Sequence, residues 1–184
     1  MILYKVSDKN PANPHGKTLL HFAAKGGHVR ICELIISKVK DKSPVDHLWR
    51  ETPLHWAARE NHFEVCDLLL NYMADKSPKD RDGRTPLHVA AEHGHLATGK
   101  LILKQVSEKN PKDNVGLTPF HLAARAGNFK LFQYIFNRAE DKNPRDNNGN
   151  TPKVCAWYCP TKEKINNLVE KANMQKRKRK IVET

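Results

Sequence analysis

Residues 85–95 read TPLHVAAEHGH, and this stretch returns along the chain with small changes. It appears as TLLHFAAKGGH at 18–28, TPLHWAARENH at 52–62 and TPFHLAARAGN at 118–128, and a degraded form begins at Thr151. The successive threonines lie 34, 33, 33 and 33 residues apart. A second marker, Lys-(Asn/Ser)-Pro, precedes every copy, at residues 9–11, 42–44, 76–78, 109–111 and 142–144. A fixed period of this length predicts an array of similar structural units.

The letters of one unit predict a pair of helices. A Thr side chain caps a helix start, and Pro at the first helical position loses no hydrogen bond that the helix needs. Leu-His-x-Ala-Ala then gives a short helix with a small Ala face, and apolar residues at helical spacing (Val65, Leu68 and Leu69) predict a second, antiparallel helix. Residues 75–84 have turn chemistry, in which Gly83 is free to take a positive φ. One such pair buries too little surface alone, so the units must stack into a solenoid.

The TPLHxAAxxGH pattern resembles the ankyrin repeat, and the resemblance covers residues 8–160. It implies an all-α fold: an ankyrin-repeat solenoid of stacked antiparallel helix pairs in two layers, with β-hairpin loops projecting at right angles. The chain is similar to a subset of these repeats whose loop reads DKNPxDxxGxTPLH. In this subset the Gly usual after the second helix is replaced, here by Val6, Val39, Met73, Val106 and Ala139.

The repeat register predicts where each unit begins and ends. We expect a partial repeat at 1–12, ankyrin repeats at 13–45, 46–79, 80–112 and 113–145, a degenerate C-terminal capping repeat at 146–175 and a basic tail at 176–184. Residues 2–11 align with residues 102–111, so the chain starts within the second helix of a preceding repeat. We therefore expect a segment of a longer array, the alternative being a genuine start at Met1 with a weak first repeat.

Two units depart from the pattern. Repeat two has one extra residue between Asp46 and Thr52, and it carries Arg50 where the other loops carry Gly. Its loop is therefore expected to differ in shape. In the last unit Lys153, Val154 and Pro160 replace the usual Leu, His and Gly, and a polar helix from Lys162 to Asn173 is expected to cap the stack.

Composition limits the class of protein. The 32 Lys and Arg outnumber the 20 Asp and Glu, which gives a net charge of +12. No run approaches the 18 or so apolar residues of a transmembrane helix, and the first ten residues do not form a secretory signal. Four Cys in 184 residues do not make a disulfide framework. We expect an intracellular monomer, cytoplasmic or nuclear, without membrane association.

Motifs that suggest chemistry have structural interpretations here. Residues 94–100 match G-x-x-x-x-G-K, but Leu101 stands where a phosphate-binding loop needs Ser or Thr, and the register places residues 95–103 on a helix. His21, His55, His88 and His121 recur about 10 Å apart, too far to share a metal ion. The resemblance implies that each hydrogen-bonds a neighbouring loop, and the turn residues His28, His62 and His95 are interpreted in the same way.

The cysteines and carboxylates also give no sign of catalysis. Cys32 and Cys66 occupy equivalent positions in adjacent repeats and are expected in the core, while Cys155 and Cys159 lack a zinc-binding spacing. The carboxylates fall in loops without a catalytic constellation. We expect no enzymatic activity, no cofactor and no metal.

A basic run follows the predicted cap, and it consists of Lys176, Arg177, Lys178, Arg179 and Lys180. Such a run is either a solvated, disordered tail or a nuclear-import or polyanion-binding segment. Without residues 171–184 the chain keeps 26 cations and 19 anions, so the repeats are basic as well.

The resemblance implies that the chain binds a protein partner through its concave face, which the loop tips and the ends of the first helices form. Trp49, with Arg81 and Arg84 on the next loop, is the leading anchor, because an exposed aromatic beside Arg is typical of a binding hot spot. The alternative is that Trp49 folds back onto its own repeat. The predicted contact residues are His47, Leu48, Trp49, Glu51, Arg59, Arg81, Asp82, Arg84, Glu92, His93, Asn114, Val115, Leu117, Arg125 and Tyr158.

The basic charge favours an acidic protein segment as the partner. Nucleic-acid or polyanion binding by the basic repeats and tail is the alternative, and it is not favoured because aromatic residues are not interleaved with the charges. A third possibility is that the chain is part of a larger ankyrin-repeat protein.

Overall fold

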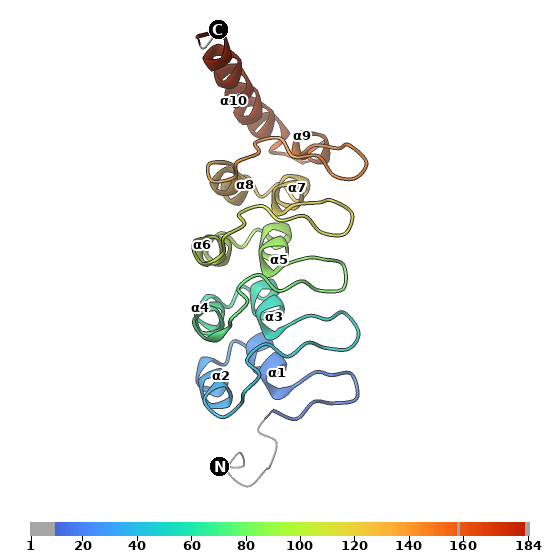
Figure 1. The fold of residues 1–184 in the computed structure, drawn as a ribbon, viewed down its shortest axis with the longest axis vertical. Helices are drawn as coiled ribbons and strands as arrows, with labels where there is room; N and C mark the ends of the chain where they lie inside the picture. Colours follow the sequence, from blue (N-terminus) through green and yellow to red (C-terminus); the bar gives the residue numbers. More distant parts are fainter. Residues whose placement is uncertain (1–9, 158, 183–184) are drawn as a thin grey trace.

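The computed structural model describes residues 10–157 and 159–182. Within these residues the chain forms helices in pairs that stack along one axis (Figure 1). The pairs are α1 (Leu19–Lys25) with α2 (Val29–Ile36), α3 (Pro53–Arg59) with α4 (Phe63–Tyr72), α5 (Pro86–His93) with α6 (Leu96–Gln105), α7 (Pro119–Arg125) with α8 (Phe129–Phe136), and α9 (Pro152–Cys155) with α10 (Lys162–Val182).

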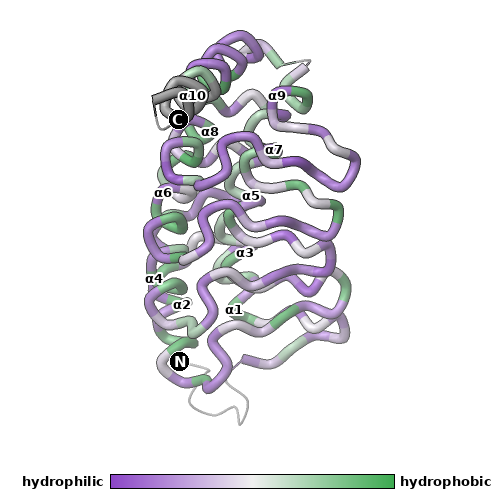
Figure 2. The backbone as a smooth tube through the Cα atoms, turned by 45° about the horizontal axis from the view of Figure 1, so that its top comes forward, coloured by the Kyte–Doolittle hydropathy of each residue, from purple (hydrophilic) through white to green (hydrophobic). Residues whose placement is uncertain are grey.

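The helices form two layers, as the resemblance to ankyrin repeats implies. The first helices α1, α3, α5, α7 and α9 pack one on the next, and so do the second helices α2, α4, α6, α8 and α10. The loops between pairs project to one side, beside the first helices (Figure 1). Figure 2 shows hydrophobic residues concentrated along the helices and hydrophilic residues along most of the loops. The core is one continuous cluster from Leu20 to Val169, so each unit depends on its neighbours.

The lysine of the Lys-(Asn/Ser)-Pro marker bonds the carbonyls at the C-terminal end of the second helix in three repeats. The sequence did not predict this role. The ammonium group of Lys109 donates to the carbonyls of Leu103, at 2.8 Å, and Val106. Lys42 makes the equivalent bonds to Ile36 and Val39, and Lys142 reaches Phe136. The last carbonyls of a helix lack intrahelical partners, and a cation also interacts favourably with that end of the helix dipole. In these three repeats the Lys of the Lys-(Asn/Ser)-Pro marker is therefore a C-terminal cap of the second helix.

Two details differ from the prediction. The described residues contain no β-strand, and their isolated β-bridge joins Ala12 to Thr18, so the projecting loops are tight turns rather than regular hairpins. Helix α10 does not end at Asn173 but runs through the basic run to Val182. The backbone of residues 176–180 is thus helical in this structure.

The loop of repeat two has a different closure, as its extra residue predicts. Its ends meet where the N–H of Asp46 donates to Glu51, whereas the next loop closes from Asp80 to Arg84, one residue shorter. Arg50 takes φ 55°, in the left-handed region, where Gly83 takes 77°. A side chain at this conformation costs about 1 kcal/mol, because Cβ crowds the following carbonyl.

Replacing Arg50 with Gly is expected to raise the free energy of unfolding by about 0.5–1 kcal/mol, since glycine adopts this φ without strain. Urea unfolding followed by circular dichroism measures the change. The matched control is Gly83→Ala, which should destabilise because the added Cβ would lie 2.9 Å from the backbone nitrogen of Asn114. A neutral or destabilising Arg50→Gly would contradict the expectation.

Candidate functional site

The loop tips are joined into one surface by a backbone hydrogen bond between each loop and the next. An N–H of one tip donates to a carbonyl of the preceding tip at each junction: Arg81 to Trp49 at 2.8 Å, Asn114 to Asp82 at 2.9 Å, His47 to His15 at 2.8 Å and Asn147 to Val115 at 3.1 Å. Side-chain amides add a second bond at two junctions, from Asn114 to the carbonyl of Arg81 and from Asn147 to that of Asn114. The tips therefore present their side chains from a fixed framework.

The histidines of the TPLHxAA motif each form a hydrogen bond to the loop of the next repeat. In His88, Nδ1 accepts the N–H of Thr85 at 3.0 Å and lies 3.0 Å from its Oγ1, while Nε2 lies 3.1 Å from the carbonyl of Leu117 on the next loop. Because Nδ1 accepts a backbone N–H, the proton must reside on Nε2, which donates to the carbonyl. The same bonds recur at His21, His55 and His121, as the resemblance implied.

Burial keeps these imidazoles neutral. It lowers the pKa of His55 to about 4 and that of His88 to about 3, and the pKa of His21 and of His121 is lowered for the same reason. A second proton would have to occupy Nδ1, where the Thr N–H already points. The turn residues His62 and His95 likewise reach the preceding repeat, at the carbonyls of Lys25 and Arg59.

Ion pairs cross the concave face between the loops and the ends of the first helices. Arg59 donates to the two carboxylate oxygens of Glu51 from its two terminal guanidinium nitrogens. In the next repeat the charges exchange places: Arg84 on the loop pairs with Glu92 on the helix at 3.1 Å. Glu92 also accepts from Arg125 of the following repeat at 2.9 Å. Three of the predicted partner-binding arginines are therefore already paired within the chain.

Glu51 is the most buried member of this network, with 7% of its surface exposed. Burial by itself would raise the pKa of its carboxyl, but the Arg59 guanidinium lowers it overall. Glu51 therefore fixes the position of the Arg59 guanidinium. Leu117 is partly buried, because its side chain packs against the core.

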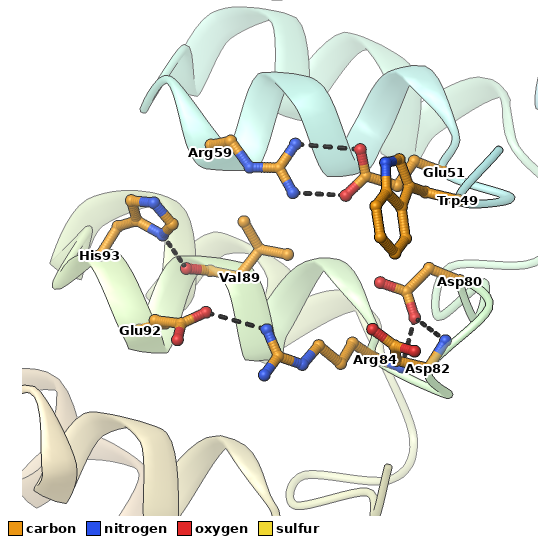
Figure 3. Close-up of a pocket in the computed structure, with 9 residues that line it drawn as sticks. All are labelled: Trp49, Glu51, Arg59, Asp80, Asp82, Arg84, Val89, Glu92 and His93. Carbon is orange, nitrogen blue, oxygen red and sulfur yellow. Dashed lines mark hydrogen bonds and ion pairs between the residues drawn. The ribbon is translucent and has the colours of Figure 1, made fainter. Parts of the chain in front are cut away.

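A hollow of about 300 Å³ lies between the loops of repeats two and three, and we call it the Trp49 hollow. Figure 3 shows the Trp49 indole projecting between the Glu51–Arg59 pair and the Asp80 carboxylate. Half of the Trp49 surface is exposed, so the indole is displayed rather than folded away. The hollow is lined by Trp49, Glu51, Arg59, Asp80, Asp82, Arg84, Val89, Glu92 and His93.

A second hollow, of about 210 Å³, lies on the other side of Trp49. Its wall includes Trp56, over whose ring the ammonium groups of Lys17 and Lys25 lie, 5.3 and 5.9 Å from the ring centroid. Trp49, Glu51 and Arg59 line both hollows and separate them.

The structure thus brings most of the predicted contact residues to one face. Further residues that were not predicted line the same face. Leu48, Trp49 and Val115 are about half exposed at the loop tips. Tyr158 lies outside the described residues, as do the side chains of residues 176–180. Sequence reasoning missed Trp56 and Val89, which occupy the variable position of TPLHxAA, and that position could have identified them because it lies on the helix face that lines the hollows.

The charge of the Trp49 hollow does not match the acidic partner that the composition favoured. Its wall holds four carboxylates, from Glu51, Asp80, Asp82 and Glu92, against the two guanidinium groups of Arg59 and Arg84. Both guanidinium groups have carboxylate partners. An acidic side chain entering this hollow would therefore meet net negative charge.

The described residues do not gather three His, Cys, Asp or Glu side chains in a way that could hold a metal ion. Nor does the described part of the chain contain a helix of the length and apolar character needed to cross a membrane. Cys32 and Cys66 are buried, as predicted, and burial raises the pKa of their thiols to about 11 and about 12.

Comparison with protein families finds ankyrin repeats in this chain. A model of three ankyrin repeats matches residues 1–80 and 20–113, and a model of a single ankyrin repeat matches residues 115–144. A comparison with curated proteins gave no match.

Proposed function

Because the chain belongs to the ankyrin-repeat family, whose repeats are generally protein–protein interaction modules, we propose that it is a non-enzymatic scaffold that binds a protein segment along its concave face and loop tips. The observation that carries this proposal is the row of exposed apolar side chains on hydrogen-bonded loop tips, namely Leu48, Trp49 and Val115. Such side chains, held in place before binding, lose little conformational freedom when a partner docks. The ion pairs of Arg59, Arg84 and Arg125 support the proposal, because they keep the floor of this surface rigid.

The proposal predicts that Trp49→Ala removes a specific partner. Affinity capture from nuclease-treated lysate, at low and moderate salt, is expected to retain a discrete protein on the unaltered chain and to lose at least about tenfold of it on the variant, as for a hot-spot aromatic. The matched control is Tyr72→Ala, because Tyr72 is a similarly exposed aromatic on helix α4 of the outer layer. Equal retention by Trp49→Ala and the unaltered chain would contradict the assignment of the concave face.

We propose polyanion binding by the basic end of helix α10 as a second candidate. The observation in its favour is that α10 carries residues 176–180 as a continuous helix beyond the last repeat (Figure 1). Binding through phosphate contacts weakens steeply with salt. A chain lacking residues 176–184 is the discriminating bait in the same capture. Material lost on that deletion or on nuclease treatment supports the second candidate, and material that both baits retain at both salts supports the scaffold.

A further inference from the structure

We propose that the Trp49 hollow binds the positively charged side chain of an arginine or lysine carried by the partner segment. This inference rests on the scaffold function proposed above and adds the chemistry that the concave face recognises at one position. It opposes the acidic partner expected from the net charge of +12. The argument depends on which charges of the hollow are satisfied within the chain.

The unsatisfied charges are the two aspartates of the repeat-three loop. The Glu51 and Glu92 carboxylates each have an arginine partner. Asp80 uses Oδ1 to accept the N–H groups of Asp82 and Arg84, at 2.9 and 2.8 Å. Within the described residues, no cation forms an ion pair with Asp80 or Asp82.

The equivalent aspartates of the following loops are better compensated. In Asp113, Oδ2 lies 3.9 Å from Nε of Arg84, and in Asp146 it accepts from the Asn150 side chain at 3.0 Å. Repeat three directs its own Arg84 away from Asp80, toward Glu92 and Asp113. Partial burial raises the pKa of Asp80, and the negative charges of Asp82 and Glu51 raise it further. A cation entering the hollow would offset that repulsion.

Trp49 supplies the other half of a cation site. Its backbone is held on both sides: its N–H donates to Asp46 Oδ1 at 2.7 Å and its carbonyl accepts from Arg81 at 2.8 Å. Figure 3 shows the indole next to the Asp80 carboxylate in the wall of the hollow. A tryptophan face attracts ammonium and guanidinium groups, and a guanidinium can also stack on it while it bonds a carboxylate through two nitrogens.

The size and lining of the hollow suit one long side chain. Its volume of about 300 Å³ is at the lower end of the range for ligand pockets. The half-exposed indole of Trp49 gives the wall an apolar surface for the methylene stem, and the buried Val89 lies in the wall as well. Long cationic side chains bury their stems on such surface while the charged group remains at a polar site. The walls therefore match an arginine or lysine in both its apolar and its charged parts.

The test is titration of the isotope-labelled full chain with the peptide acetyl-Gly-Ser-Arg-Ser-Gly-amide, followed by nuclear magnetic resonance. Companion peptides carry lysine, citrulline (a neutral isostere of arginine) or glutamate in the central position. We expect saturable shifts of the Trp49 indole N–H and of the amides of residues 80–84 with arginine and lysine. The citrulline and glutamate peptides should bind at least about fivefold more weakly, as for the loss of one partly screened charge pair. Tighter binding of arginine than of lysine would show that stacking contributes beyond charge.

The variant Asp82→Asn removes one of the two aspartate charges of the hollow. It should disturb the fold less than a change at Asp80, because Asp82 is exposed at the loop tip. It should weaken the arginine peptide about fivefold. Glu64→Gln on helix α4 is the control, since it removes an exposed carboxylate from the outer layer and changes the net charge equally. Equal binding of the arginine and citrulline peptides, binding of the glutamate peptide at Trp49, or no saturable shift at millimolar concentration would each overturn the proposal. If these occur while Trp49→Ala still abolishes partner capture, the scaffold function stands and the cation site alone is wrong.

Discussion

Acidification from pH 7 to pH 5 is expected to destabilise the stack by about 2 kcal/mol for each of His55 and His88. Burial lowers the pKa of these imidazoles to about 4 and about 3 in the folded chain, whereas in the unfolded chain it is near the ordinary value of about 6.5. Between those values the unfolded state binds protons that the folded state excludes. Stability is therefore complete above about pH 6.5 and is lost progressively as the pH falls toward the folded-state values.

Urea unfolding at half-unit steps between pH 7.5 and pH 5 measures this loss. The range lies above the ordinary pKa of Asp and Glu, so histidines dominate the change. The slope of unfolding free energy against pH should approach about 1.4 kcal/mol per unit for each proton taken up. His21 and His121, whose pKa is also lowered, should add to it. A free energy of unfolding that stays constant from pH 7 to pH 5 would mean that these imidazoles accept protons in the folded state.

The fold could be predicted from the sequence because the same local sequence signals occur in each repeat. Thr at each helix start, His three residues later and a run of small Ala residues specify the same helix pair several times, and each pair confirms the register of the next. The burial of Cys32 and the different shape of the repeat-two loop followed from position in the repeat, and the role of His21 followed from the resemblance to ankyrin repeats. The structure confirms all three. The end of helix α10 did not follow, because a run of like charges gives no local stop signal such as Gly or Pro.

The charge of the binding face could not be predicted in the same way. A net charge of +12 describes the whole surface, but the concave face depends on which side chains meet across repeats. Arg84 is a surface cation in the sequence, yet in the structure it pairs with Glu92, which lies eight residues later and also binds Arg125 of the next repeat. Sequence reasoning named Arg59, Arg84 and Arg125 as surface cations but could not identify the carboxylates with which they pair.

Replacing His88 with Ala is expected to lower the free energy of unfolding by about 3–5 kcal/mol. The change leaves the buried Thr85 N–H without a partner, at about 1–3 kcal/mol, and adds a cavity. It also removes one of the two hydrogen bonds that the Leu117 carbonyl accepts, the other coming from the N–H of Asp113. The control is His93→Ala, because His93 is exposed and bonds a carbonyl of its own helix, at Val89. That variant should differ from the unaltered chain by less than about 1 kcal/mol.

The location of the damage separates a general loss of packing from the loss of this particular link. His88 joins helix α5 to the loop at residues 113–117, so hydrogen exchange of that loop should accelerate in His88→Ala under conditions in which the repeats stay folded. The same amides should exchange normally in His93→Ala. If the loop stays protected while stability falls, the histidine acts through core volume alone, and the loop tips that carry Val115 are held by their backbone hydrogen bonds to the neighbouring tips.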